Sequence, residues 1–316
     1  MRQNVIAAEM RGQGLSVVLG TYNRKSFLKL TIGSVRKELD STAISHEIIV
    51  VDGGSTDGTI SWLARQKDIV SIIQHNRGKW RGKPIERRTW GYFMNLGFKC
   101  AQGKYICMLS DDCLLVPGAI HNGLAYAQKR LSAGVNLGAV AFYFIRNYPR
   151  GTEYVVIREG DHVYVNHGIY LNEALRSVGY VDEDSYQFYA ADVDLCFRMI
   201  SKGYSVEACP ESKVVHFGHI NVRVRISNKR VITEDARVFR AKWAHMLQTT
   251  GREPLPHLAT LLNHPFTTRE IRGHGLTLTL AIMHSQALIR LLSSRTFGYA
   301  IKAIKRHPLA KKLTGL

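Results

Sequence analysis

Three short apolar segments, each followed at once by a polar loop, limit the folds that this chain can adopt. They are residues 15–19 (LSVVL), 47–51 (EIIVV) and 105–109 (YICML), and the loops after them begin GTYNR, DGGSTDG and SDDC. Segments with helical spacing of apolar residues separate them, and buried strands that alternate with helices predict a mostly parallel sheet. The loops after the carboxyl ends of such strands lie at one edge of the sheet, where ligands bind.

Two adjacent carboxylates, Asp111 and Asp112, end the third apolar segment. At the carboxyl edge of a sheet they can hold a hard divalent cation through their oxygens, and such a cation can bridge phosphates. A solvated Asp-Asp turn is the alternative, and the pair taken alone would favour it. The neighbouring motifs favour the cation-binding interpretation.

The remaining pattern extends the alternation of helices and strands. Ser26 is the expected N-cap of the helix after the first strand. Residues 74–84 are basic and glycine-rich, which indicates a mobile loop that reaches anionic groups, with a solvated basic loop as the alternative. Further elements are predicted as helices from residue 59 and at 85–102, 119–133, 172–177 and 192–202, and as strands at 70–73, 138–170 and 204–208.

The net charge of +18 on 316 residues is unevenly distributed. Residues 1–220 carry +5 and residues 221–316 carry +13, so the C-terminal third is expected to meet an anionic partner. Five cysteines without a C-x-x-C pair suggest a reduced protein without a disulfide framework. The first residues lack the apolar core of a signal peptide, and no uniformly apolar run approaches a membrane span. We therefore expect a cytoplasmic protein, either free or peripheral on the inner face of the membrane.

The last twenty residues, 297–316, contain a candidate interfacial helix. Phe297, Ile301 and Ile304 share one face at helical spacing, while Lys302 and Lys305 lie elsewhere. Such a helix can lie on an anionic membrane surface. A helix that packs on the preceding domain with solvated lysines is nearly as well supported, and both interpretations stay open.

Six segments together resemble the family 2 glycosyltransferases, which are nucleotide-sugar enzymes with the GT-A fold. In order they are SVVLGTYNR, EIIVVDGGSTDGT, MNLGFKCAQGKYICMLSDDC, SVGYVDED, AADVDLCFRM and VVHFGH. The resemblance implies a catalytic domain over residues 1–225, with a nucleotide-binding half at about 15–113 and an acceptor-binding half at about 114–225. It predicts an α/β fold with a Rossmann-like sheet flanked by helices, and residues 226–316 are expected to form a basic helical extension.

The resemblance also implies a donor site in the first half. The first loop lines the nucleotide pocket, and Asp52 accepts a hydrogen bond from the base, most simply the N3–H of uracil or thymine. A tight Asp-Gly turn that caps a helix is the structural alternative for DGGSTDG. Asp111 contacts the ribose or the sugar, and Asn95 helps to order the donor loop. The donor-binding set is Thr21, Tyr22, Asn23, Arg24, Asp52, Asn95 and Asp111.

The implied metal site joins Asp112 with a histidine further along the chain. Asp112 corresponds to the family's metal motif and binds Mn²⁺ or Mg²⁺, which neutralises charge on the departing nucleoside diphosphate. His216 matches a histidine that completes the metal shell in many relatives, and His219 is the alternative. An imidazole ligand suits Mn²⁺ better than Mg²⁺.

Two acids at the start of a predicted helix, Asp192 and Asp194, correspond to the family's E-D-x-D-L segment, although Ala191 replaces the glutamate. The resemblance makes Asp192 the general base that removes the acceptor's hydroxyl proton, and a single displacement then inverts the anomeric carbon. Alternatively, both acids complement the helix dipole. Asp194 is favoured to order the helix start, with Arg198 one turn on. The acceptor-side candidates are His167, Tyr186, Tyr189 and Asp194.

The predicted activity is an inverting, metal-dependent transfer of a hexosyl or deoxyhexosyl group from a nucleotide sugar, with UDP- or dTDP-sugars favoured. The acceptor is a hydroxyl of a glycan or a lipid-linked molecule, and nucleic acid is not expected as a partner. A catalytically weak relative that binds nucleotide, membrane or nucleic acid through its basic region is the alternative. A dinucleotide-dependent dehydrogenase is disfavoured because no G-x-G-x-x-G follows the first strand.

Overall fold

The computed structural model describes residues 14–76, 78–146, 153–216, 231–247 and 258–259, and all of them belong to one compact unit. The predicted interfacial helix at 297–316 and the alternative ligand His219 lie outside the described residues. The boundary expected at residue 225 stays a prediction. The described helix beyond it packs on the preceding residues, as shown below.

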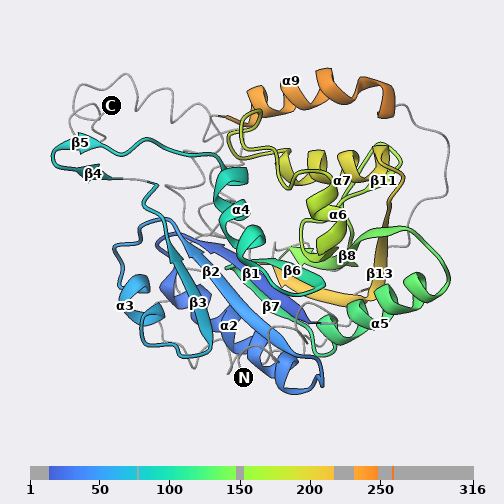
Figure 1. Ribbon diagram of the computed structural model, residues 1–316, viewed down its shortest axis with the longest axis horizontal. Helices are drawn as coiled ribbons and strands as arrows, with labels where there is room; N and C mark the ends of the chain where they lie inside the picture. Colours follow the sequence, from blue (N-terminus) through green and yellow to red (C-terminus); the bar gives the residue numbers. More distant parts are fainter. Residues whose placement is uncertain (1–13, 77, 147–152, 217–230, 248–257, 260–316) are drawn as a thin grey trace, which may run out of the picture. The chain divides into compact units, whose positions relative to one another are not determined.

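An eight-stranded sheet forms the centre of this unit, in the order β3-β2-β1-β6-β12-β8-β13-β7 (Figure 1). The first four strands in this order are parallel, β13 is parallel to β8, and β12 and β7 are antiparallel to their neighbours. The strands are β1 (Leu15–Thr21), β2 (His46–Asp52), β3 (Ile69–Ile73), β6 (Tyr105–Ser110), β7 (Cys113–Leu115), β8 (Leu137–Arg146), β12 (Gly168–Leu171) and β13 (Ser205–His216).

Helices cover both faces of the sheet (Figure 1). Helices α2 and α5 lie on one face, while α4, α6 and α7 lie on the other. The described helices are α2 (Lys25–Asp40), α3 (Thr59–Leu63), α4 (Trp90–Cys100), α5 (Ala119–Ser132), α6 (Asn172–Ser177), α7 (Ala191–Ser201), α9 (Ile232–Trp243) and the 3₁₀ helix η1 (Ala244–Met246). The shorter strands pair as β4 (Lys79–Trp80) with β5 (Lys83–Pro84), β9 (Glu153–Tyr154) with β14 (Leu258–Ala259), and β10 (Arg158–Glu159) with β11 (His162–Val163).

The core lies on both faces of the parallel strands, which explains their continuous apolar sequences. Leu15, Val17, Val18 and Leu19 of β1 are all fully buried. Helix α4 approaches β1 closely at Gly97, where a Cβ atom would lie 2.6 Å from Cγ1 of Val18. A residue without a side chain is therefore required at this contact between helix and sheet.

The predicted α/β architecture is confirmed, and four local expectations are corrected. Helix α4 begins at Trp90 rather than at residue 85, because the Thr89 side chain caps it by accepting a hydrogen bond from the Tyr92 N–H at 3.1 Å. Ser26 does not cap α2, which begins one residue earlier, at Lys25. The loop at 74–84 contains the β4–β5 hairpin. Strand β13 continues to His216 rather than ending at residue 208, and this extension carries the histidine to the carboxyl edge of the sheet.

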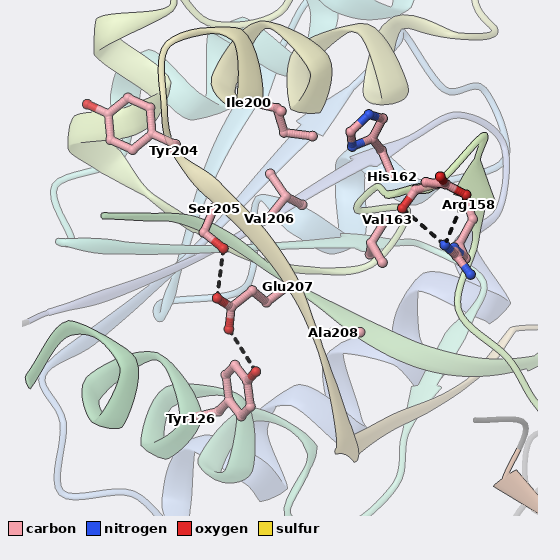
Figure 2. Close-up of a pocket in the computed structure, with 11 residues that line it drawn as sticks. Tyr126, Arg158, His162, Val163, Ile200, Tyr204, Ser205, Val206, Glu207 and Ala208 are labelled. Carbon is pink, nitrogen blue, oxygen red and sulfur yellow. Dashed lines mark hydrogen bonds and ion pairs between the residues drawn. The ribbon is translucent and has the colours of Figure 1, made fainter. Parts of the chain in front are cut away.

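Two negative observations apply to the described residues. None of their helices is long and apolar enough to cross a membrane. A cavity of about 450 Å³ lies between α5, the β10–β11 region and β13 (Figure 2), but it is lined by none of the described residues predicted for the site. The candidate site lies elsewhere, at the carboxyl ends of the parallel strands.

Candidate active site

Strand register brings the three predicted loops to one edge of the sheet. Thr21 at the end of β1 pairs with Asp52 at the end of β2, and Gly20 pairs with Ser110 at the end of β6. Each loop therefore leaves the sheet at the same level. The edge predicted from the apolar segments is present, and polar side chains from three loops converge there.

Asp111 and Asp112 are buried and share a cation from the first loop. The Arg24 guanidinium donates to Oδ1 of Asp111 at 2.7 Å and to Oδ2 of Asp112 at 3.2 Å. The Thr21 hydroxyl donates to the other oxygen of Asp111 at 2.7 Å. Burial raises the pKa of Asp111 to about 6, although Arg24 opposes the rise and Asp112 adds to it. The pair is not the solvated turn that was the alternative interpretation.

The first and second loops are hydrogen-bonded to each other through Asn23. Its backbone N–H donates to the Ser55 hydroxyl at 2.8 Å, and its side-chain oxygen accepts from the Thr56 N–H at 2.7 Å. Asn23 has a left-handed φ of 51°, a conformation that asparagine tolerates better than most residues. Asp57 accepts the backbone N–H of Thr59, the first residue of α3, at 3.1 Å. These contacts fix the shape of the predicted nucleotide pocket.

Asp52 holds its own loop with one carboxylate oxygen and leaves the other for a ligand. Oδ1 accepts from the backbone N–H groups of Gly54 at 2.8 Å and Ser55 at 2.7 Å. Oδ2 is buried and accepts no hydrogen bond from the described residues. A buried carboxylate oxygen without a donor costs free energy, so this atom indicates a site for a ligand N–H.

Asp112 and His216 meet as predicted for a metal site. Nε2 of His216 lies 3.2 Å from Oδ1 of Asp112, and Asp112 is almost completely buried. Two ligands at right angles on an ion with bonds of 2.0–2.2 Å are separated by about 3 Å. The two side chains therefore fit adjacent coordination positions of one divalent ion.

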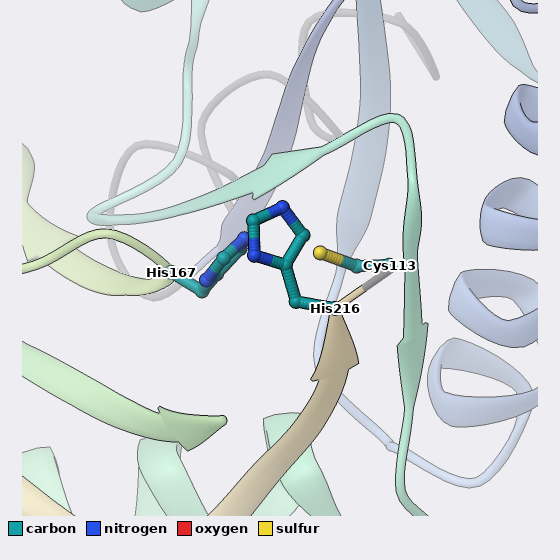
Figure 3. Close-up of side chains that lie close together, drawn as sticks. All are labelled: Cys113, His167 and His216. Atoms are coloured by element: carbon teal, nitrogen blue, oxygen red, sulfur yellow. The ribbon is translucent and has the colours of Figure 1, made fainter. Parts of the chain in front are cut away.

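A two-residue segment, Asn166 and His167, connects the metal residues with the predicted base. The His167 ring lies 4.7 Å from the His216 ring, centroid to centroid (Figure 3). Nε2 of His167 is 3.2 Å from the Ser110 hydroxyl. The side-chain amide of Asn166 donates to Oδ2 of Asp192 at 3.3 Å. His167 was expected on the acceptor side, whereas the structure buries it completely beside the metal residues. Sequence reasoning missed Asn166, although it directly precedes His167, which was among the candidates.

Asp192 lies in the first turn of α7. This helix begins directly after Ala190, which has a left-handed φ of 64°. Its side chain is partly exposed to the site, and its Oδ1 accepts the Val193 N–H at 3.0 Å. Burial raises the pKa of Asp192, and the hydrogen bond from Asn166 opposes the rise. A carboxylate with a raised pKa is a stronger proton acceptor.

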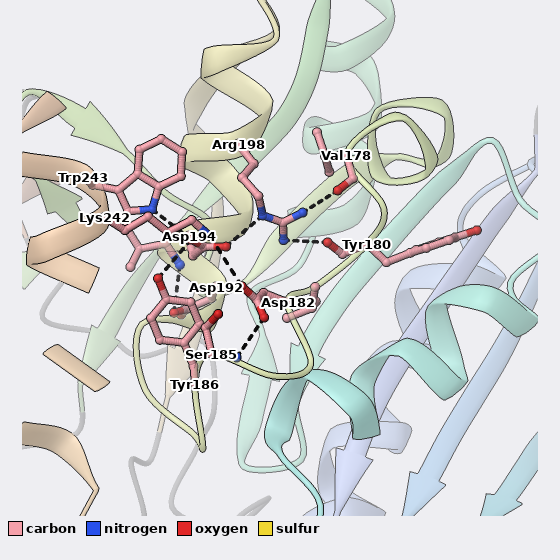
Figure 4. A network of polar contacts seen from close by, with 12 residues as sticks. Val178, Tyr180, Asp182, Ser185, Tyr186, Asp192, Asp194, Arg198, Lys242 and Trp243 are labelled. Atoms are coloured by element: carbon pink, nitrogen blue, oxygen red, sulfur yellow. Dashed lines mark hydrogen bonds and ion pairs between the residues drawn. The ribbon is translucent and has the colours of Figure 1, made fainter. Parts of the chain in front are cut away.

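Asp194 belongs to a buried polar network (Figure 4). It is fully buried and binds Nε of Arg198 at 2.8 Å, the Tyr186 hydroxyl at 3.0 Å and Nε1 of Trp243 at 2.8 Å. Nζ of Lys242 lies 2.8 Å from the same carboxylate. Both oxygens of Asp194 are engaged within the protein, and the acceptor-side roles expected for Asp194 and Tyr186 stay predictions. The predicted pairing of Asp194 with Arg198 is present.

Asp235 of α9 holds the loop that leads to Asp192, and sequence reasoning missed it entirely. Its carboxylate accepts the backbone N–H groups of Gln187 at 2.9 Å, Phe188 at 3.0 Å and Tyr189 at 2.8 Å. Asp235 is almost completely buried. Tyr189 was expected on the acceptor side, and its backbone is fixed here directly before α7. The first described part of the basic extension thus contributes to the framework of the site.

Asn95 supports the same loop from the opposite side. It is buried, its side-chain amide donates to the Val181 carbonyl at 2.9 Å and to Glu183 at 2.7 Å, and its oxygen accepts the Val181 N–H at 3.0 Å. Its side chain is therefore committed to the 181–183 segment. These contacts join α4 to the loop before Asp192, and the donor-loop role expected for Asn95 stays a prediction.

Curated relatives resemble only part of this chain. Chondroitin synthase of Escherichia coli is 28% identical over 111 residues, which cover 34% of this chain and 14% of that protein. Validoxylamine A glucosyltransferase of Streptomyces hygroscopicus subsp. jinggangensis is 30% identical over 138 residues, or 42% of this chain and 30% of that protein. The alignments thus span at most 30% of the length of these two relatives.

Solved structures resemble the fold over nearly the whole chain. The crystal structure of S. aureus TarS 1–349 has a TM-score of 0.52 at 14% identity, and the match covers 95% of this chain and 77% of that one. The mannosyltransferase PcManGT from Pyrobaculum calidifontis, in complex with GDP-Man and Mn²⁺, has a TM-score of 0.50 at 18% identity, with 96% and 84% covered. The sequence model described as glycosyl transferase family 2 matches residues 16–179. This is more than half of the chain, which therefore belongs to glycosyl transferase family 2.

Proposed function

We propose that this protein transfers a sugar from a nucleoside diphosphate donor to a hydroxyl group, with inversion at the anomeric carbon. The observation that carries the proposal is the link between the Asp112–His216 pair and Asp192 through two adjacent residues, Asn166 and His167. A group that neutralises a diphosphate and a group that accepts a proton are thereby held in one site. These are the two requirements of a direct displacement with a diphosphate leaving group.

The nucleobase is proposed to bind at Asp52. Its buried Oδ2 requires a donor, and the N3–H of uracil or thymine supplies one without rearrangement of the loop, which Oδ1 already holds. Cytosine has no N–H at this ring position. UDP- and dTDP-sugars are therefore favoured over CDP-sugars.

Asp112 and His216 would hold a divalent ion, with Mn²⁺ favoured over Mg²⁺ because one ligand is an imidazole. When bound, the ion supplies positive charge to the diphosphate of the leaving group. Thr21 and Arg24 fix the two carboxylates in place, since they donate three hydrogen bonds to Asp111 and Asp112. Arg24 reduces the repulsion between these carboxylates and so keeps Asp112 in its ligand position.

The acceptor's proton is proposed to pass to Asp192. Asn166 orients this carboxylate through its hydrogen bond, and burial raises the pKa, so the carboxylate accepts a proton more readily than an exposed aspartate would. Attack from the face opposite the diphosphate inverts the anomeric carbon. Asp192 belongs to helix α7, whereas Asp112 lies between β6 and β7 and His216 ends β13, so the base and the metal residues come from separate elements.

The acceptor is proposed to be a glycan or a lipid-linked molecule. The charge of +13 on residues 221–316 supports an encounter with an anionic surface, and a peripheral position on a membrane would bring the site to a lipid-linked acceptor. The same charge supports the alternative function, in which a catalytically weak protein binds nucleotide, membrane or nucleic acid. The two proposed functions differ in whether the nucleotide-sugar donor is consumed.

The test measures release of the nucleoside diphosphate from a panel of UDP- and dTDP-sugars, with water as the acceptor and Mn²⁺ present. We expect slow release by the wild-type protein and none by Asp192→Asn, which should still bind the nucleotide. Asp112→Ala should lose the metal-dependent binding itself. Release that is unchanged in Asp192→Asn would place the base elsewhere, and no release from any donor would favour the binding protein.

A further inference from the structure

Three potential metal ligands, of which Cys113 and His167 belong to no predicted metal set, lie together beside the candidate active site (Figure 3). A ligand atom from each of Cys113, His167 and His216 lies within 4.8 Å of the other two. Cys113 and His167 are buried, and His216 is partly exposed. We propose that these three side chains form a binding site for Zn²⁺, distinct in its ligands from the Asp112–His216 pair but sharing His216 with it.

The sheet places the three ligands without any need for a loop to fold around the ion. Cys113 in β7 lies directly opposite His216 in β13, so their side chains project from the same face of the sheet. His167 directly precedes Gly168, the first residue of β12, and its ring lies 4.7 Å from that of His216. Two ligands therefore lie in strands of one sheet and the third directly before another strand of it, which limits the rearrangement that binding requires.

The separations fit a tetrahedral ion after small side-chain rotations. Zn–S bonds of about 2.3 Å and Zn–N bonds of about 2.0–2.1 Å imply ligand atoms about 3.4–3.6 Å apart. The upper limit of 4.8 Å in the structure therefore has to shrink by about 1 Å. Three protein ligands leave one position for water or for a carboxylate oxygen. Binding converts the Cys113 thiol into a Zn–thiolate, and its proton is released to solvent.

The ligand types favour zinc over the ion proposed for the donor site. A thiolate and two imidazoles are ligands of a borderline-soft ion, whereas a carboxylate and one imidazole also suit Mn²⁺. Divalent zinc binds most nitrogen and sulfur sites more tightly than Mn²⁺ does. Because His216 belongs to both sets, the two ions are expected to compete for its ring. The proposed consequence is inhibition of the Mn²⁺-dependent site by zinc.

Cobalt provides a test that needs neither donor nor acceptor. Co²⁺ replaces Zn²⁺ in tetrahedral sites and gives a near-ultraviolet charge-transfer absorption only when a thiolate binds it. We expect this absorption in the wild-type protein and its loss in Cys113→Ser, with displacement by one equivalent of Zn²⁺. Cys100→Ser, which alters a partly exposed cysteine outside the cluster, should leave the absorption unchanged. Asp112→Asn should also retain it.

Calorimetry distinguishes the loss of a metal ligand from the loss of the folded structure. Cys113→Ser should weaken Zn²⁺ binding at least about tenfold, because loss of a supporting group alone weakens metal binding by 10–100-fold, while Mn²⁺ binding with UDP should be unchanged. A cobalt spectrum without a thiolate band, or a band that survives Cys113→Ser in the folded protein, would overturn the proposal. Failure of the glycosyl-transfer assay would leave these spectra unaffected, so the two proposals can fail separately.

Discussion

Replacement of Asp235 by alanine should destabilise the protein more than any neighbouring substitution in α9. The carboxylate is 2% exposed and accepts three backbone N–H groups, from Gln187, Phe188 and Tyr189, at 2.8–3.0 Å. A hydrogen bond to a charged group contributes about 1.5–3 kcal/mol, and the three share one carboxylate, so their contributions do not add fully. A buried N–H group that is left without an acceptor costs about 1–3 kcal/mol. We therefore expect a loss of about 4 kcal/mol in the free energy of unfolding for the three N–H groups together.

The isosteric Asp235→Asn gives an intermediate result. Its amide oxygen can still accept the two N–H groups that Oδ2 binds, from Phe188 and Tyr189, but its NH₂ group faces the N–H of Gln187. The expected loss is about 2 kcal/mol.

Equilibrium urea unfolding measures both variants, with Glu234→Ala as the control. Glu234 is the adjacent residue of α9 and forms an exposed ion pair with Arg237. The unfolding midpoint of Glu234→Ala should therefore match that of the wild type. If Asp235→Ala unfolds at the midpoint of this control with an unchanged slope, the carboxylate does not hold the loop.

One pH profile and two further substitutions test separate parts of the account. Turnover should rise with pH through a pKa above that of an ordinary aspartate, because Asp192 acts deprotonated and burial raises its pKa. The pH profile of kcat/KM measures this, and an acid limb at the ordinary aspartate pKa contradicts it. Gly97→Ala should cost about 1–2 kcal/mol in urea unfolding, since its Cβ would meet Cγ1 of Val18 at 2.6 Å, and an unchanged midpoint contradicts the close packing. Arg24→Gln should lower the free energy of unfolding in urea by about 3 kcal/mol and raise the pKa of Asp111 further, because it removes the ion pair. NMR titration of the carboxyl group measures this pKa, and an unchanged pKa of Asp111 contradicts the ion pair.

The strands and the edge of the sheet could be predicted because their signals are local. A buried parallel strand requires consecutive apolar residues, and the polar residue that ends it marks the edge, as Asp52 and Ser110 do. The extension of β13 could not be predicted, because the polar residues Glu211 and Lys213 interrupt its apolar pattern. Pairing with β7 and β8 overrides this weak local signal.

The supporting residues could not be predicted because their partners are distant in the sequence. Asp235 binds residues 46–48 positions away, and Asn95 binds residues 86–88 positions away. A polar residue on an amphipathic helix has the same local pattern whether it is solvated or buried against a loop. The local pattern therefore does not reveal that the side chains of Asn95 and Asp194 are hydrogen-bonded to distant parts of the chain.

Calorimetric titration with UDP, dTDP, GDP and CDP, each with Mn²⁺ and with EDTA, tests the central claim most directly. We predict binding of UDP or dTDP in Mn²⁺, no binding in EDTA, and loss of binding in Asp52→Ala. The reason is that Oδ2 of Asp52 receives the base and the Asp112–His216 pair holds the ion that meets the diphosphate. If none of the four nucleotides binds to the folded protein in Mn²⁺, this edge of the sheet is not a donor site and the proposed transfer is wrong.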